Sequence, residues 1–204
     1  MKRQIKKLRL PLFTFVILVL SLKSNAEDGS RLWLPADANT NAQVSANKKS
    51  PTITIAIQEL QKHWYGTPIQ LIISSTKKVG NLGNDGFIIS GNINTGLTIT
   101  ALTEYGLLYG AYHLLRLQAT QSLPAVLNIT ESPKYARRIL NHWDNLDRSI
   151  ERGYAGRSLW EWEKMPDEIS PRYAEYARAN ASVGINGSVL NNVNANPQIL
   201  TPEY

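Results

Sequence analysis

The segment that decides the predicted fold is RILNHWDNLDRSIERGYAGRSLWEW, residues 138–162. It begins with an apolar strand, Arg138–Trp143, which ends in polar groups. A long loop, Asp144–Asp167, follows and is dense in Arg, Glu, Tyr and Trp. Because polar residues gather where the strand ends, we expect the chemistry of this region at the carboxyl end of the strand.

A helix and a second strand follow this loop. Ser170 and Pro171 have the N-cap and first-turn pattern of a helix, which we expect over Arg172–Val183. Ser188–Val193 is the next apolar strand and ends in an Asn-rich stretch. A strand, a helix and a strand in this order predict a βαβ unit. A (β/α)8 barrel takes about 250 residues, so residues 132–204 are expected to be the incomplete beginning of one, truncated after its first strands.

Residues 27–131 predict a separate N-terminal α/β sandwich domain. The expected order is strand, helix, three strands, helix and strand, and residues 37–49 are expected to form a loop. The expected strands and helices cover residues 31–35, 51–64, 69–73, 86–90, 97–101, 104–118 and 124–129. Gly106 and Gly110 lie one helical turn apart, which indicates close packing of the second helix against the sheet.

Residues 1–26 have the three parts of a secretory signal peptide. Met1–Arg9 is basic, Leu10–Leu22 is apolar, and Ser24 and Ala26 suit signal peptidase. The apolar run is short for a membrane span, which needs about 20 residues, although an uncleaved anchor is the alternative. We expect a mature chain from Glu27, without a membrane segment, in the periplasm or outside the cell.

Composition excludes several classes of function. The first 26 residues hold six of the 22 basic residues and no acidic ones, so 16 basic residues face 16 acidic ones in the rest. A neutral body argues against nucleic acid as a partner. The chain has no Cys, which excludes disulfides and thiolate metal sites, and its three His make a multi-histidine metal centre improbable.

The residues best suited to a sugar site lie late in the Asp144–Asp167 loop. Trp160 offers an aromatic face, and Arg157 can pair with a carboxylate in bidentate fashion. In an extended segment Trp160 and Trp162 point to opposite faces, so only one of them can line a pocket. The structural alternative is that the Trp residues pack the loop and that Arg157 pairs with Glu161.

Other polar residues of this segment have simpler interpretations. Asp144 and Asp147 invite comparison with the two carboxylates of glycosidases, but Asp after a strand more often caps a turn. His142 is interpreted as a hydrogen-bonded supporting residue rather than a base. The amides of residues 191, 192 and 194 (all Asn) can bind hydroxyls or cap turns.

The stretch RILNHWDNLDRSIERGYAGRSLW resembles the start of the central domain of microbial α-glucuronidases, glycoside hydrolase family 67. LTEYGLLYGAYHLLRL at 102–117 resembles the helix that closes that family's N-terminal domain, and ASVGINGSVLNNVNA at 181–195 its second barrel strand. Arg148 departs from the small residue expected in the turn, and it is costly there if the backbone needs a positive φ.

The resemblance implies hydrolysis of terminal (4-O-methyl)glucuronic acid from xylo-oligosaccharides with inversion and without a cofactor. It implies that the catalytic carboxylates lie on later strands, so no catalytic residue is assigned in this chain. It suggests Trp160 as a sugar-stacking wall and Glu161 and Arg157 as contacts to the uronate. A homodimer of the full-length protein is one expected assembly. The alternatives are a secreted carbohydrate-binding module without catalysis and a fragment of a family 20 hexosaminidase.

Overall fold

The computed structural model describes residues 32–34, 37–75, 79–80, 82–154, 156–190 and 200–202. The predicted signal peptide and the three Asn residues at 191, 192 and 194 lie outside these ranges. Among the described residues, none of the helices combines the length and the apolar character that crossing a membrane requires.

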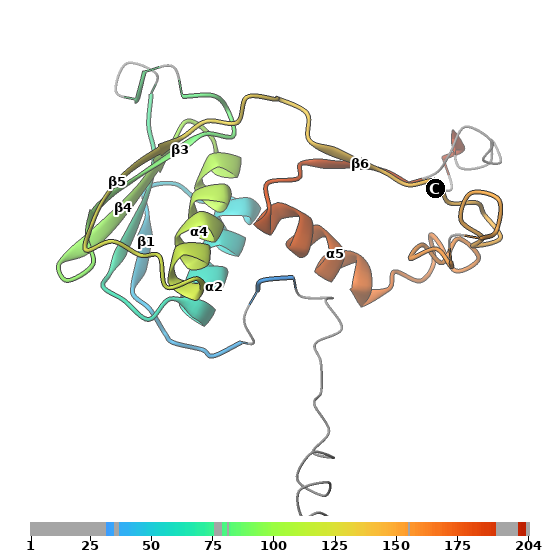
Figure 1. Ribbon diagram of the computed structural model, residues 1–204, viewed down its shortest axis with the longest axis horizontal. Coiled ribbons are helices and arrows are strands. Elements are labelled where there is room, and N and C mark those ends of the chain that lie inside the picture. Colours follow the sequence, from blue (N-terminus) through green and yellow to red (C-terminus); the bar gives the residue numbers. More distant parts are fainter. Residues whose placement is uncertain are drawn as a thin grey trace, which may run out of the picture. The chain divides into compact units, whose positions relative to one another are not determined.

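The first half of the described chain is built on a five-stranded mixed sheet (Figure 1). The strand order is β1-β2-β4-β3-β5. β1, β2 and β4 are parallel, whereas β3 is antiparallel to both β4 and β5. The strands are β1 (Val44–Ala46), β2 (Ile69–Ile73), β3 (Phe87–Asn92), β4 (Gly96–Ala101) and β5 (Val126–Glu131).

Helices α2 (Pro51–His63) and α4 (Glu104–Ala119) lie on one face of this sheet (Figure 1). Alternate residues of the strands, such as Leu97, Ile99 and Ala101 of β4, are buried, as expected for a sheet with one covered face. Leu60 of α2 and Leu107 of α4 are fully buried in the same core. The mixed α/β class predicted from the sequence is therefore confirmed.

The sequence also contains the signals that start both helices. Ser50 Oγ accepts a hydrogen bond from Ile53 N at 3.1 Å, and Thr103 Oγ1 accepts one from Gly106 N at 3.3 Å. Such caps satisfy backbone donors that the first helical turn leaves without partners. Ser170 is also an N-cap residue, but its side chain makes no capping hydrogen bond.

Gly106 and Gly110 bring α4 close to the sheet, as predicted. A Cβ at residue 106 would lie 2.3 Å from the carbonyl oxygen of Gly86, and one at residue 110 would lie 2.6 Å from Ile99 Cγ2. Neither position has room for a larger side chain, so the approach of helix and sheet depends on both glycines.

The second half forms a strand–helix–strand unit, again as predicted. β6 (Ile139–Asn141) and β7 (Gly187–Val189) pair in parallel, and α5 (Pro171–Ser182) connects them. Parallel neighbours need a crossover connection of this kind. β6, α5 and β7 thus form a βαβ unit whose two strands end at the same edge.

Two boundaries in the N-terminal part were predicted wrongly. Residues 32–34 of the expected first strand are not extended: Leu32 has φ of 53°, which is incompatible with a strand. The first strand is instead β1, inside the segment 37–49 that was expected to be a loop. β1 has only three residues, so the alternation of Val44, Ser45 and Ala46 is too short to identify a strand within a polar segment.

Candidate functional site

The segment between β6 and α5, residues 142–170, is called here the strand-end loop. It folds back on itself through two isolated antiparallel bridges, Asp144 with Ile150 and Ser149 with Arg157. These pairings place the later part of the loop, which contains Trp160, beside the residues that directly follow β6. The two backbone bridges within the strand-end loop therefore help to fix the position of Trp160.

A buried carboxylate closes this loop. Asp144 is 3% exposed, and its Oδ2 accepts a hydrogen bond from Ser158 Oγ at 2.5 Å. Ser158 Oγ also accepts a hydrogen bond from Trp160 N at 2.9 Å. Asp144 Oδ1 lies 3.7 Å from His142 Nδ1. The serine and the histidine both face the same carboxylate, so this is not the Ser–His–Asp order in which histidine activates the serine. The contacts of Asp144 are those of a loop-closing residue.

His142 connects the loop to the βαβ unit. Its Nε2 lies 2.5 Å from Tyr176 Oη on α5, and Tyr176 Oη lies 3.3 Å from Ser188 Oγ on β7. The backbone N–H of His142 donates to Val189 O at 2.8 Å. His142 thus has partners on both α5 and β7, in agreement with its interpretation as a supporting residue.

Trp160 lies in an aromatic cluster rather than on the surface. It is 6% exposed, and its ring centroid is 4.9 Å from that of Tyr173, 5.4 Å from Tyr176 and 5.6 Å from His142. Its Nε1 is buried and has no hydrogen-bond partner among the described residues. The cluster thus holds one buried indole donor without a partner among the described residues.

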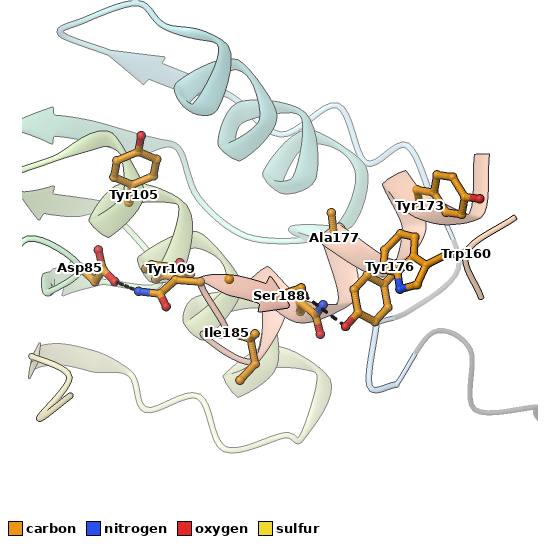
Figure 2. A pocket seen from close by; sticks show the side chains of 12 residues that line it. Asp85, Tyr105, Tyr109, Trp160, Tyr173, Tyr176, Ala177, Ile185 and Ser188 are labelled. Carbon is orange, nitrogen blue, oxygen red and sulfur yellow. Dashed lines mark hydrogen bonds between the residues drawn. The ribbon is translucent and has the colours of Figure 1, made fainter. Parts of the chain in front are cut away.

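This cluster forms one end of an open cavity of about 610 Å³ (Figure 2). The residues that line it are mostly aromatic or neutral polar and come from α4, α5, β7 and the loops beside them. They are Asp85, Tyr105, Tyr109, Trp160, Tyr173, Tyr176, Ala177, Asn180, Ile185, Asn186, Gly187 and Ser188. Pockets with aromatic walls and a few fixed polar groups suit ligands such as sugars.

The two ends of the cavity differ in chemistry. The aromatic end is near the carboxyl ends of the strands, since Trp160 packs on His142. At the other end, near the start of β7, Asn186 Nδ2 donates to Asp85 Oδ2 at 3.0 Å (Figure 2). Burial raises the pKa of Tyr109, and the nearby Asp85 carboxylate raises it further, so this hydroxyl stays protonated.

Of the three predicted sugar contacts, only Trp160 lines the cavity. Glu161 Oε1 accepts a hydrogen bond from Arg148 Nη1 at 3.0 Å, and its Oε2 is 3.3 Å from Lys164 Nζ. Arg157 is exposed. Glu161 therefore pairs with Arg148 and not, as the structural alternative had it, with Arg157. A role for these three residues in sugar binding remains a prediction.

Arg148 adopts the unfavourable conformation that its position suggested. Its φ is 70°, in the left-handed region that a small residue would enter more easily. Its side chain contacts Glu161, Glu163 Oε1 at 3.2 Å and the Ser158 carbonyl at 3.3 Å. The same residue therefore brings backbone strain and three contacts that hold the loop.

Asp147 caps a turn. Its Oδ1 accepts hydrogen bonds from Ser149 Oγ at 2.6 Å and from Ser149 N at 2.9 Å. The hydrogen bond from the Ser149 side chain, followed by that from its backbone, lowers the pKa of Asp147 below its usual value. In the part of the chain that the structure describes, no three His, Asp or Glu side chains are grouped closely enough to hold a metal ion.

The remaining site residues could be predicted only in part from sequence patterns. Tyr173 and Tyr176 are three residues apart on a helix and so share a face, but the pattern does not say that Trp160 meets that face. Asp85 and Tyr109 come from the first half of the chain, and no local pattern connects them to β7.

The chain matches a known glycoside hydrolase family. Residues 117–204 match the family described as "Glycosyl hydrolase family 67 middle domain". The chain is 33% identical over 226 residues to the "Probable alpha-glucuronidase A" of Neosartorya fischeri, covering 95% of this chain and 27% of that protein. It is 40% identical over 131 residues to that of Aspergillus fumigatus, covering 64% of this chain and 15% of that protein.

These matches place the chain among the glycoside hydrolases. Within that class, the chain belongs to glycosyl hydrolase family 67, as the sequence resemblance predicted. It spans about a quarter or less of the length of these α-glucuronidase relatives.

Solved structures of family 20 enzymes are more distant. The GH20 β-N-acetylhexosaminidase from Streptomyces coelicolor matches 57% of this chain and 26% of its own with a TM-score of 0.37 and 21% identity. The GH20 exo-β-N-acetylglucosaminidase from Vibrio harveyi matches 59% of this chain and 22% of its own with a TM-score of 0.40 and 17% identity. TM-scores below 0.5 do not distinguish between the enzyme families considered above.

Proposed function

We propose that this chain is part of a secreted α-glucuronidase that removes terminal (4-O-methyl)glucuronic acid from xylo-oligosaccharides. The observation that carries the proposal is the alignment to a probable α-glucuronidase over 95% of this chain at 33% identity. The reaction requires a carboxylic acid that protonates the leaving oxygen and a base that activates water on the opposite face of the sugar. In this proposal both groups come from later strands of the full-length protein, and inversion is the stereochemical outcome.

The described residues supply part of the sugar pocket in this proposal. Trp160 packs against Tyr173 and Tyr176, so the part of its ring that lines the cavity is a rigid apolar surface. Such a surface favours the C–H face of a pyranose. Glu161 forms ion pairs with Arg148 and Lys164, so its first role is to hold the loop. In this proposal its contact with the uronate is secondary.

The finer fold assignment belongs to the same proposal. We infer that residues 27–131 form an N-terminal sandwich domain and that β6, α5 and β7 begin a (β/α)8 barrel within residues 132–204. Two parallel strands are seldom stable alone, and parallel sheets are covered on both faces. Ile139 is 47% exposed and Val189 is 43% exposed, which supports further strands and helices beside this pair. Secretion and homodimer formation by the full-length protein are proposed on the sequence pattern and the resemblance respectively.

Hydrolysis of an aldouronic acid tests the proposal. The 204-residue chain is expected to show no turnover, whereas the full-length protein is expected to release glucuronic acid as the β-anomer, detectable by proton NMR at early times. Turnover by the chain alone would contradict the assignment of the acid and base to later strands. Release of N-acetylglucosamine from a hexosaminide, without action on aldouronic acids, would favour the family 20 alternative.

A further inference from the structure

A bidentate ion pair joins helix α5 to helix α2. Arg178 Nε donates to Glu59 Oε1 at 2.7 Å, and Arg178 Nη2 donates to Glu59 Oε2 at 2.8 Å. The two side chains are 27% and 8% exposed. Fork-to-fork pairing of this kind fixes the orientation of both side chains, which a single-contact pair does not.

The Glu59 end of the pair is anchored in the core of the first half of the chain. Glu59 lies on α2 between Ala56 and Leu60, both of which are fully buried. A carboxylate at such a position is costly unless it is paired. His63 Nε2, which also lies on α2, accepts a hydrogen bond from Arg178 Nη2 at 3.0 Å. Arg178 therefore meets a preformed acceptor site on α2.

The opposite side of α5 carries the aromatic cluster. Arg178 and Tyr176 are two residues apart, which on a helix of 3.6 residues per turn places them roughly 200° apart around the axis. Tyr176 contacts both His142 and Trp160. A rotation or shift of α5 that breaks the contact of Arg178 with Glu59 therefore also moves the ring against which Trp160 packs.

A second ion pair lies at the start of β6, away from the aromatic cluster. Arg138 Nη2 donates to Asp85 Oδ2 at 2.7 Å, and Asn186 shares that carboxylate. This pair holds the start of β6 and β7, whereas Glu59 and Arg178 join α5 itself to α2.

We propose that Glu59 and Arg178 are positioning residues for the Trp160 wall: the pair fixes α5 against α2 and thereby sets the geometry of the aromatic end of the cavity. That this wall binds a sugar rests on the proposed function, whereas the mechanical role of the pair does not. Neither residue lines the cavity, so its influence on the site runs through α5.

Hydrogen exchange of the full chain tests the proposal. Glu59→Gln keeps the size of its side chain, Arg178→Gln shortens its side chain, and each removes one charge. Both variants are expected to speed amide exchange in peptides covering 158–162 and 172–176 by about tenfold or more, because each removes the bidentate contact and leaves the partner's charge unpaired. Exchange in β2 and β4 is expected to stay at the wild-type rate. A rise of the same size throughout the chain, or no rise in these peptides, would overturn the proposal.

Two matched variants make the result specific. Lys62→Gln removes an exposed ion pair with Asp37 from the same helix and is expected to leave exchange near Trp160 unchanged. The double variant Glu59→Gln/Arg178→Gln removes both charges and is expected to restore part of the protection, since neither side chain then has an unpaired charge. A double variant with the summed defect of the two single variants would contradict coupling between the residues.

The outcome is separable from the enzymatic proposal. Suppose that Arg178→Gln speeds exchange near Trp160, but the full-length protein does not act on aldouronic acids. This result would support the positioning role and refute the proposed function. Hydrolysis by the full-length protein, together with unchanged exchange in both single variants, would keep the function and refute the positioning role.

Discussion

At the scale of single residues, Arg148 shows how a strained position is retained. Its backbone is in the left-handed region, and its guanidinium meets Glu161, Glu163 and the Ser158 carbonyl. A non-glycine residue in that region costs roughly 1–2 kcal/mol. The contacts of an ion pair that is partly exposed are worth a similar or smaller amount. Strain and contacts therefore nearly offset each other at this turn.

Two variants of Arg148 separate these effects. Arg148→Ala and Arg148→Gly both remove the guanidinium, but only the alanine variant keeps a Cβ at positive φ. We expect the free energy of unfolding of Arg148→Gly, measured by urea denaturation, to be about 1 kcal/mol higher than that of Arg148→Ala. Equal stability of the two variants would mean that the turn relaxes to negative φ once the contacts are lost.

His63 makes the stability of the chain depend on pH. Burial lowers its pKa, with a further lowering by Arg178, while Glu59 and Asp37 act in the opposite direction. Arg178 only donates hydrogen bonds, so His63 Nε2 must accept and the neutral ring carries its proton on Nδ1. Protonation of His63 Nε2 would place its N–H donor opposite the N–H donor of Arg178 Nη2, and the hydrogen bond would be lost. The groups that face this ring are Glu59, Arg178, Asp37 and Lys62.

The direction of the pH effect follows from this depressed pKa. The unfolded chain takes up a proton at His63 near pH 6.5 and the folded chain only at lower pH, so stability is complete above pH 6.5 and decreases below it. We expect the free energy of unfolding to fall between pH 7 and pH 5. Burial also lowers the pKa of His113. His63→Gln should therefore flatten part of this dependence, and His63→Gln/His113→Gln more of it. A slope that is the same in the wild type and the double variant would contradict this account.

At the scale of secondary structure elements, tight packing outweighs helix propensity at Gly106. Alanine is favoured over glycine inside a helix by about 1 kcal/mol. A methyl group at residue 106 would, however, collide with the Gly86 carbonyl oxygen at 2.3 Å. We expect Gly106→Ala to destabilise the chain by about 1–3 kcal/mol, the usual range for overpacking, as measured by chemical denaturation. A gain in stability would show that α4 can move away from the sheet without loss.

Elements with a strong local pattern were predictable from the sequence. α4 has apolar residues at helical spacing and a Thr cap, and the structure gives it within one residue of the predicted range. α2 and α5 are similar. β5 begins two residues later than expected, since strand ends depend on pairing partners more than on local sequence. β1 pairs with β2 over three residues only, and this is too short for its alternating pattern to identify it.

The site could be predicted only where its contacts are local. The strand-end loop was found from its composition, and its caps and turns follow from short patterns. The ion pair of Glu59 with Arg178 joins residues 119 positions apart, and the choice of Arg148 over Arg157 as the partner of Glu161 depends on how the loop folds. Periodicity shows which side of an element is apolar, but it does not show which distant element that side meets.

At the scale of the whole molecule, the two halves of the described chain differ in how completely their apolar residues are covered. The five-stranded sheet has a continuous core with α2 and α4. The βαβ unit leaves Ile139, Trp143 and Val189 between 43% and 52% exposed, and only Ser182 of α5 is buried. Segments with few buried apolar contacts open at low free energy. The two halves are therefore expected to differ in local stability.

Limited proteolysis measures this difference. In the 204-residue chain, we expect residues 135–204 to be cut well before residues 37–131, because β6 and β7 pair only with each other among the described strands. Mass spectrometry of the early products should show a protected fragment that ends near Glu131. Arg178→Gln should speed cleavage within 135–204 further, since it removes the pair that holds α5 to α2. The carbohydrate-binding module predicts the opposite result: a self-sufficient fold would keep 135–204 intact and would unfold it in one cooperative transition. Resistance of this segment in the isolated chain would therefore contradict the barrel proposal and favour the module.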